Sequence, residues 1–413
     1  MKRLNTLRVA GVALGLALLT ACSQNPLDTT RAESPVAREI NTLFWITIII
    51  SAVVFVLVQG AVMYMARRFR APADPFDDEN IYTDEEFPHQ THGNTTLEIG
   101  WTVLPALLMA VMAFLTLQTL STLDEVDASE PGDVISHIDV VGAQWWWEYH
   151  YYLDGNDTGN PDFVTANEIV IPVDEEVRLN VTSRDVIHSF WIPRLNGKRD
   201  AVPGRSSTWT LEAEAPGRYQ GQCTEFCGLS HAYMQMWAVA IPANEYAAWA
   251  DNQMTDRPAP AEGEPGHEGW KVFEANCARC HVINGATDTN VDEVADGMSL
   301  YGFGGDEIID RVIPDMANQV SGAAPNLTHL MTRTTYAGSI FDLYEDPDDI
   351  NYAQLPAAGT LNRGDFEAWI LNAPAEKANA ADQEGAARGM PSFAGALSGE
   401  ALDDLVDYLM TLD

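Results

Sequence analysis

The sequence predicts a multi-domain chain with a two-helix transmembrane hairpin, a β domain and a helical C-terminal domain. Three observations lead to this fold class. Two uncharged apolar segments lie within the first 120 residues, strand-like patterns follow up to about residue 242, and helical patterns return after residue 266. A chain of 413 residues is long enough for two or three domains.

The chain is strongly acidic. It carries 23 Lys and Arg residues against 60 Asp and Glu residues, for a formal net charge of -37. Nucleic acid is therefore excluded as a partner, because phosphate binding needs a basic surface. An acidic face suits a basic protein partner. Negative charge on this scale also keeps a protein soluble, so it does not by itself locate a docking surface.

The first segment has the pattern of an export signal. Basic residues at positions 2, 3 and 8 precede an apolar stretch at 9–19, which runs into Leu19-Thr20-Ala21-Cys22. This tetrapeptide resembles a bacterial lipoprotein cleavage box. The resemblance implies a signal peptide over 1–21, a lipid anchor at Cys22 and an exported segment over 22–41. An ordinarily cleaved or uncleaved signal with an incidental cysteine is the alternative.

Two apolar segments predict a transmembrane hairpin over 42–120. Residues 43–65 and 99–117 carry no charge, and each is long enough to cross about 30 Å of hydrocarbon as a helix. Three arginines follow the first segment and three acidic residues follow the second. Because basic residues stay on the cytoplasmic side, we expect the loop 66–94 in the cytoplasm. Both termini would then lie on the periplasmic or outer side of a bacterial inner membrane.

The next part of the chain predicts strands. Within 130–245, apolar residues at 177, 179 and 181 alternate with polar neighbours. Pro-Gly pairs mark turns, and no strand–helix–strand rhythm is present, which favours a sandwich or barrel. Residues 246–266 are rich in Pro, Glu and Ala and predict an extended linker. Helical patterns then predict a separate domain over 267–413.

A dense set of soft metal ligands lies near the end of the β domain. The run 223–234 reads Cys-Thr-Glu-Phe-Cys-Gly-Leu-Ser-His-Ala-Tyr-Met, and His188 lies 35 residues before its first cysteine. Thiol, imidazole and thioether groups favour copper or another thiophilic metal. Two coppers bridged by both thiolates could share one electron, with His188 and His231 as terminal ligands. A disulfide or a structural zinc site is the alternative, although neither explains Met234.

Residues 92–240 resemble subunit II of cytochrome c oxidase in order and spacing. The family's dinuclear copper A motif, a His followed later by Cys-x-Glu-x-Cys-x-x-x-His-x-x-Met, matches this sequence without departure. The resemblance implies a cupredoxin-like Greek-key β-barrel. It also implies that Glu225 binds copper through its backbone carbonyl and a magnesium at the subunit I boundary through its side chain. The implied copper ligands are His188, Cys223, Glu225, Cys227, His231 and Met234.

Two further positions take roles from this resemblance. The stretch Gln144-Trp145-Trp146-Trp147 is similar to the family's aromatic strand, which implies that electrons enter from cytochrome c at Trp145. Packing in an aromatic core is the alternative for these rings. The segment around Glu98 and Trp101 resembles the start of the family's second membrane helix. It makes Glu98 a candidate for proton uptake, against the alternative of a solvated anchor at the membrane boundary.

The C-terminal domain carries the motif Cys277-Ala-Arg-Cys280-His281, which is typical of covalent c-type haem. Two thiols add to the haem vinyl groups, and the adjacent His is the proximal iron ligand. A redox or zinc pair is the alternative. The segments around Met390 and Pro325 resemble the distal and haem-contacting stretches of class I cytochromes c. This resemblance implies an all-α cytochrome c domain with Met390 as distal ligand, ahead of Met298, Met316, Met331 and Met410. The segment between His281 and Pro325 is longer than in a compact cytochrome c.

These features predict the electron-input subunit of a respiratory cytochrome c oxidase. Electrons would pass from a cytochrome c donor through haem c and copper A to the haem of subunit I. There dioxygen is reduced to water, coupled to proton translocation. Neither apolar segment contains a histidine cluster, so we expect the dioxygen site in a partner subunit. The alternatives are an electron-feeding subunit of a copper A nitric oxide reductase and a membrane-tethered copper-delivery lipoprotein. The intact copper ligands argue against quinol as the direct donor.

Overall fold

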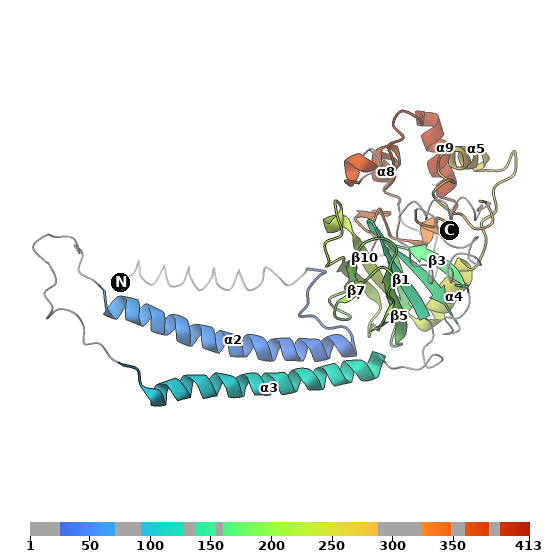
Figure 1. Ribbon diagram of the computed structural model, residues 1–413. Helices are drawn as coiled ribbons and strands as arrows, with labels where there is room; N and C mark the ends of the chain where they lie inside the picture. The colour runs from blue at the N-terminus through green and yellow to red at the C-terminus, as the bar shows by residue number, and fades with distance from the viewer. Residues whose placement is uncertain are drawn as a thin grey trace, which may run out of the picture. The chain divides into compact units, whose positions relative to one another are not determined.

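The computed structural model describes residues 25–70, 92–127, 137–153, 160–287, 324–347, 360–379 and 389–413. The predicted signal peptide, Cys22, most of the expected cytoplasmic loop, Met298 and Met316 lie outside the described residues. The chain divides into two units. One unit is the helical stretch Glu39–Glu125, and the other holds everything before and after it (Figure 1).

The helical unit contains two long apolar helices, α2 (Pro35–Arg68) and α3 (Thr95–Asp127). They enclose the two predicted spans, and both are long and apolar enough to cross a membrane. Their large apolar side chains, such as those of Phe55, Leu57 and Leu104, are exposed in the isolated chain. Exposed apolar surface on this scale is costly in water and is satisfied by lipid. Two apolar helices are therefore confirmed.

The β domain consists of two main sheets. The first has the strand order β3-β2-β1-β5-β8, the second has the order β4-β10-β9, and β6 and β7 form a separate pair. In β5 the apolar side chains of Val177, Leu179 and Val181 are buried and the polar ones between them are half-buried, which confirms the predicted alternation. The strands are β1 (His137–Ala143), β2 (Trp146–Tyr152), β3 (Phe163–Ala166), β4 (Glu168–Pro172), β5 (Val177–Ser183), β6 (His188–Phe190), β7 (Arg199–Ala201), β8 (Ser207–Leu211), β9 (Gly217–Gln222) and β10 (Gln235–Ile241).

A helix extends the β domain beyond its last strand. Helix α4 (Ala243–Gln253) places Tyr246 and Trp249 in the core of the β domain. The Trp249 ring lies 5.4 Å from the rings of Tyr151 and Phe163. Residues 246–253, which the composition assigned to the linker, are therefore helical and packed against the sheets. The extended part of the linker begins after this helix.

The described part of the C-terminal domain is mainly helical, with one small β hairpin. Helix α5 packs against α9, where the Trp270 and Phe273 rings lie 5.8 Å and 6.0 Å from the ring of Tyr408. Gly269 allows this close packing, because a Cβ at this position would lie 2.6 Å from the Tyr408 Cβ. The elements are α5 (His267–Asn276), η2 (Leu330–Thr332), β11 (Thr335–Tyr336), β12 (Phe341–Asp342), α8 (Arg363–Glu376) and α9 (Gly399–Leu409).

Residues 33–38, here called the N-terminal strap, are bonded to the β domain. The Glu33 N–H donates to the Arg194 carbonyl at 2.9 Å, and the Glu214 N–H donates to the Glu33 carbonyl at 3.0 Å. The Ser34 hydroxyl donates to the Leu195 carbonyl. The Arg38 guanidinium pairs with the Glu214 carboxylate. The chain immediately before the first apolar segment is therefore fixed to residues that follow the second one.

Candidate metal centre

The candidate metal ligands come from β6 and from the loop that joins β9 to β10. Gln222 and Gln235 pair across these two strands, so residues 223–234, here called the ligand loop, are closed at their base. The Cys223 N–H donates to the Met234 carbonyl at 2.9 Å, which brings the first and last residues of the loop together. His231 lies in the short helix η1 (His231–Tyr233) within this loop. Strand β6 supplies His188 from the neighbouring part of the domain.

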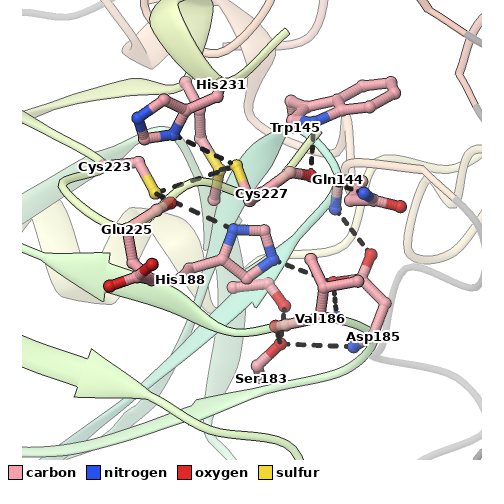
Figure 2. A network of polar contacts seen from close by, with 12 residues as sticks. Gln144, Trp145, Ser183, Asp185, Val186, His188, Cys223, Glu225, Cys227 and His231 are labelled. Atoms are coloured by element: carbon pink, nitrogen blue, oxygen red, sulfur yellow. Dashed lines mark hydrogen bonds and ion pairs between the residues drawn. The ribbon is translucent and has the colours of Figure 1, made fainter. Parts of the chain in front are cut away.

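The Cys223 and Cys227 thiols and the His188 and His231 rings converge on one centre (Figure 2). The two cysteine Sγ atoms lie 3.8 Å apart. Cys223 Sγ lies 3.9 Å from His188 Nδ1, and Cys227 Sγ lies 3.5 Å from His231 Nδ1. The Met234 Sδ lies 3.8 Å from Cys227 Sγ, and the Glu225 carbonyl oxygen lies 3.3 Å from Cys223 Sγ. All six groups singled out in the sequence therefore lie close together, and each cysteine sulfur faces a different imidazole.

This geometry bears on the two alternatives to copper. A disulfide needs about 2.05 Å between its sulfur atoms, whereas both thiols are free here at 3.8 Å. A structural zinc ion takes about four ligands in a tetrahedral arrangement. The six groups around this centre are more than one such ion uses, and thiol, imidazole and thioether groups favour copper or another thiophilic metal.

A carboxylate behind His188 orients its ring. The Asp185 Oδ1 lies 2.8 Å from His188 Nε2, and the Asp185 Oδ2 accepts a hydrogen bond from the Gln144 N–H at 2.7 Å (Figure 2). Burial, the largest single effect, would lower the pKa of His188, but the hydrogen bonds to Asp185 and Cys223 and the charges of these two groups together outweigh it and raise the pKa. A carboxylate on the distal nitrogen fixes the tautomer of a metal-binding imidazole and leaves Nδ1 for the metal.

The two thiols also influence one another. The hydrogen bond between them lowers the pKa of Cys223 and raises the pKa of Cys227. Loss of the Cys223 proton is therefore favoured even without a metal ion. Because the thiolate is the form that binds metals, the metal-free site is prepared to capture a thiophilic cation.

The aromatic strand contacts this centre from two sides. The Trp145 indole N–H donates to the Cys227 carbonyl at 3.0 Å. The Trp147 ring is fully buried and lies 5.9 Å from the ring of His188 and 5.3 Å from that of Phe190. Trp147 therefore packs in the aromatic core, whereas Trp145 is bonded to the ligand loop. Asp185 could not be recognised as part of this site from its place three residues before His188.

The haem attachment motif follows helix α5. The Cys280 and His281 N–H groups both donate to the Cys277 carbonyl at 3.0 Å, so the motif forms a tight turn. Both thiols are free, and His281 Nδ1 is hydrogen-bonded to the Pro325 carbonyl at 2.8 Å. This bond leaves Nε2 as the nitrogen available to an iron atom. The free thiols and the oriented imidazole fit a covalently bound haem. Met390 is half-buried against the helical core.

Glu98 lies in the first turn of α3, and its side chain is exposed. The Asn94 side chain begins this helix by accepting a hydrogen bond from the Thr96 N–H at 3.1 Å. The Glu225 side chain is also exposed beside the metal centre. Both carboxylates are therefore accessible to groups outside this chain.

Comparisons with known proteins agree with this arrangement. The family model of the cytochrome c oxidase subunit II periplasmic domain matches residues 136–241, and that of the subunit II transmembrane domain matches residues 23–119. Among solved structures, the periplasmic domain of subunit II of the Bradyrhizobium japonicum cytochrome oxidase is 32% identical. The match covers 30% of this chain and 96% of the Bradyrhizobium japonicum domain, with a TM-score of 0.27.

Curated relatives extend the similarity. Cytochrome c oxidase subunit 2 of Bacillus subtilis is 29% identical over 306 residues, which covers 71% of this chain and 81% of that protein. Cytochrome c oxidase subunit 2 of Alkalihalophilus pseudofirmus is 35% identical over 294 residues, which covers 70% of this chain and 79% of that protein. Since both family domains and most of the length of such a relative are matched, the chain belongs to the cytochrome c oxidase subunit II family.

Proposed function

We propose that this chain is the electron-input subunit of a respiratory cytochrome c oxidase that carries a dinuclear copper A site and a covalent haem c. The observation that carries the proposal is the convergence of two thiols, two imidazoles and a thioether on one buried centre. When bound there, a copper pair supplies a one-electron store. Cys223, Cys227, His188, His231, Met234 and the Glu225 carbonyl would hold this pair.

The residues around the ligands hold them in place during electron transfer. Asp185 fixes the His188 ring, and the Trp145 indole fixes the Cys227 backbone. The core also encloses Met234 completely. A rigid and buried ligand set changes little when the charge of the site changes by one electron, which keeps electron transfer fast. Glu225 would bind a magnesium ion shared with subunit I through its exposed side chain.

The C-terminal domain would hold the haem through Cys277, Cys280 and His281, with Met390 as the distal ligand and Pro325 orienting His281. When bound, the haem supplies a second one-electron carrier. The similarity to the Alkalihalophilus pseudofirmus protein covers 70% of this chain. A similarity confined to the chain before the end of the β-domain match at residue 241 would cover a smaller share of the sequence. The similarity therefore continues into the C-terminal part of the chain.

The two apolar helices would place the chain in a bacterial inner membrane with both ends on the outer side and Cys22 as a lipid anchor. Other oxidase subunits would surround these helices, and Glu98 would face a proton-uptake path in subunit I. The topology can be tested with reporter fusions after Arg70 and after Asp127. We expect a cytoplasmic reporter to be active only at Arg70 and a periplasmic reporter only at Asp127. The reverse pattern would refute this orientation.

Purification from the native membrane in mild detergent tests the proposed function. We expect copurification of a haem-rich subunit I, cyanide-sensitive oxygen uptake with reduced cytochrome c, a near-infrared band of a mixed-valence copper pair, and haem that stays on this chain after denaturation. Changing Cys280 to Ala should weaken haem attachment and leave the copper band intact.

Absence of copper from matured protein would contradict the proposal. Consumption of nitric oxide without oxygen uptake would instead favour the reductase. The matched relatives are cytochrome c oxidase subunits, so the comparisons give no support to that alternative or to copper delivery.

A further inference from the structure

We infer that the C-terminal domain of this chain binds the β domain at Trp145 through residues 334–339 and 377–378, a contact here called the seat. Lys377 is the positioning residue for this seat. Trp145 would then pass electrons between two parts of one chain, and an external donor would reduce the C-terminal domain instead of docking at Trp145. The electron-transfer part rests on the proposed function, whereas the seat rests on contacts alone.

Lys377, which follows α8, forms the central contact. Its amino group donates to the Trp145 carbonyl at 2.7 Å and to the Ala337 carbonyl at 2.8 Å. The lysine is 6% exposed. Burial of an amino group is costly unless its hydrogen bonds are satisfied, and here one bond goes to each domain. Next to it, the Ser230 hydroxyl in the ligand loop donates to the Ala378 carbonyl.

The turn that faces Lys377 has an unusual backbone. Ala337, Gly338 and Ser339 all have positive φ, at 57°, 78° and 60°, a region that residues other than glycine rarely adopt. Contacts with the β domain hold this turn. The Gly338 carbonyl accepts from the Gln235 N–H at 3.0 Å, and the Ser339 hydroxyl donates to the Asn167 carbonyl at 3.0 Å. Several strained residues in succession persist when the surroundings fix them.

The approach of the two domains leaves no room for a side chain at Gly338. A Cβ at this position would lie 2.8 Å from the Trp145 carbonyl oxygen and 3.0 Å from the Tyr233 carbonyl oxygen. Tyr233 belongs to the ligand loop. The turn therefore lies against both the aromatic strand and the loop that holds the metal ligands.

A buried carboxylate supplies an independent contact. Glu168, at the start of β4, is 2% exposed. Its carboxylate accepts from the Thr334 N–H at 2.9 Å and from the Thr335 hydroxyl at 2.7 Å. Since a buried carboxylate without partners is strongly destabilising, the β-domain surface is built for this occupant.

These contacts connect the two candidate cofactor domains. Lys377 bonds to the Trp145 carbonyl, and the Trp145 indole bonds to the carbonyl of Cys227. Trp145 is only 5% exposed. The family resemblance implies that Trp145 receives electrons from an external donor. Here Trp145 is hydrogen-bonded to the C-terminal domain through its carbonyl and to Cys227, a proposed metal ligand, through its indole.

Hydrogen exchange on the full-length chain tests the seat without depending on cofactors. The variants are Lys377→Met and Gly338→Ala. The controls are Lys271→Met, an exposed lysine of the same domain, and Gly364→Ala, where a Cβ meets nothing within 4 Å. We expect exchange in 334–342 and 144–150 to accelerate about tenfold in both variants, since buried carbonyls lose a partner or are displaced. Unchanged exchange in both variants would overturn the seat.

Electron transfer in the purified oxidase tests the positioning role. After flash reduction of haem c, transfer to the copper pair should slow about tenfold in Lys377→Met, because the apparent rate follows the fraction of molecules in the competent arrangement. Both reduction potentials and the near-infrared band should stay as in the unmodified oxidase. Unchanged transfer in a variant with accelerated exchange would refute the positioning role. Loss of haem or copper in the unmodified chain would instead refute the proposed function, while the exchange result still decides the seat.

Discussion

At the scale of single residues, the candidate metal centre depends on side chains that hold the ligand groups in place. Asp185 orients the His188 ring, and the Trp145 indole N–H donates to the Cys227 carbonyl in the ligand loop.

The spacing of the cysteines of the ligand loop, His231 and Met234 could be recognised in the sequence, because ligands within one short loop are constrained to be neighbours. Asp185 and Lys377 could not be recognised. Asp185 lies only three residues before His188, and its role depends on the direction of its side chain in the fold. Lys377 meets Trp145 across 232 residues of chain, so no local pattern marks either contact.

Met234 tests the copper assignment directly. Replacing it with Leu keeps the volume of the buried side chain and removes the thioether that lies 3.8 Å from Cys227 Sγ. We expect a shifted copper reduction potential, because a thioether ligand would tune the potential of a copper–thiolate site. Stability should change by less than about 1.5 kcal/mol.

The matched control for Met234 is Met236→Leu. This side chain is equally buried in the same core but is not among the six ligand groups. Redox titration of the near-infrared band measures both variants. Equal potentials in Met234→Leu and the unmodified chain would remove Met234 from the ligand set.

Asp185→Asn tests the group behind His188. The change removes the anion 2.8 Å from His188 Nε2 while keeping the shape of the side chain. We expect copper affinity to fall about 10–100-fold, as for other carboxylates that orient metal-binding imidazoles. Competition with a chelator of known affinity measures it. Asp200→Asn, at an exposed position in β7, should leave the affinity unchanged; an equal loss in both would indicate a general charge effect.

At the scale of elements, local sequence patterns predicted the type of several helices and strands, but they did not predict where the β domain ends. The two apolar helices and the alternation in β5 follow from periodicity, which local sequence carries. The end of the β domain did not follow from a local pattern, because α4 is held there by Tyr246 and Trp249, whose burial in the core depends on tertiary packing. The β11–β12 hairpin, of two residues per strand, is too short for any periodicity to reveal.

The packing of α5 on α9 gives an element-scale prediction. A methyl group at Gly269 would lie 2.6 Å from the Tyr408 Cβ and would also meet the Asp404 carbonyl. Gly269→Ala should therefore separate the helices and destabilise the C-terminal domain by about 1–3 kcal/mol. Hydrogen exchange of α9 peptides measures this loss. Gly399→Ala, where a Cβ meets nothing within 4 Å, is the control, and equal protection in both variants would refute the close packing.

At the scale of the whole molecule, the buried Lys377 makes stability depend on pH. Burial lowers the pKa of Lys377 from 10.5 to about 7. At higher pH, up to the ordinary lysine value, the unfolded chain holds a proton that the folded chain lacks. Stability should therefore rise with pH in this window, by up to about 1.4 kcal/mol per pH unit.

Denaturant unfolding of the copper-free chain between about pH 7 and pH 9 measures this dependence. The difference between the unmodified chain and Lys377→Met isolates the lysine. Lys271→Met should retain the full slope. If the free energy of unfolding changed with pH equally in the unmodified chain and in Lys377→Met, the Lys377 amino group would keep its proton in the folded chain.

The N-terminal strap carries a consequence for insertion into the bilayer. Its partners Arg194, Leu195 and Glu214 follow α3, whereas the strap itself precedes the apolar part of α2. These hydrogen bonds can form only in a shared compartment, so the chain must cross the bilayer an even number of times between them. Translocation that stalled after a single crossing would leave the strap and its partners on opposite sides. The hydrogen bonds between the strap and the β domain can therefore form only after both apolar segments have crossed the bilayer.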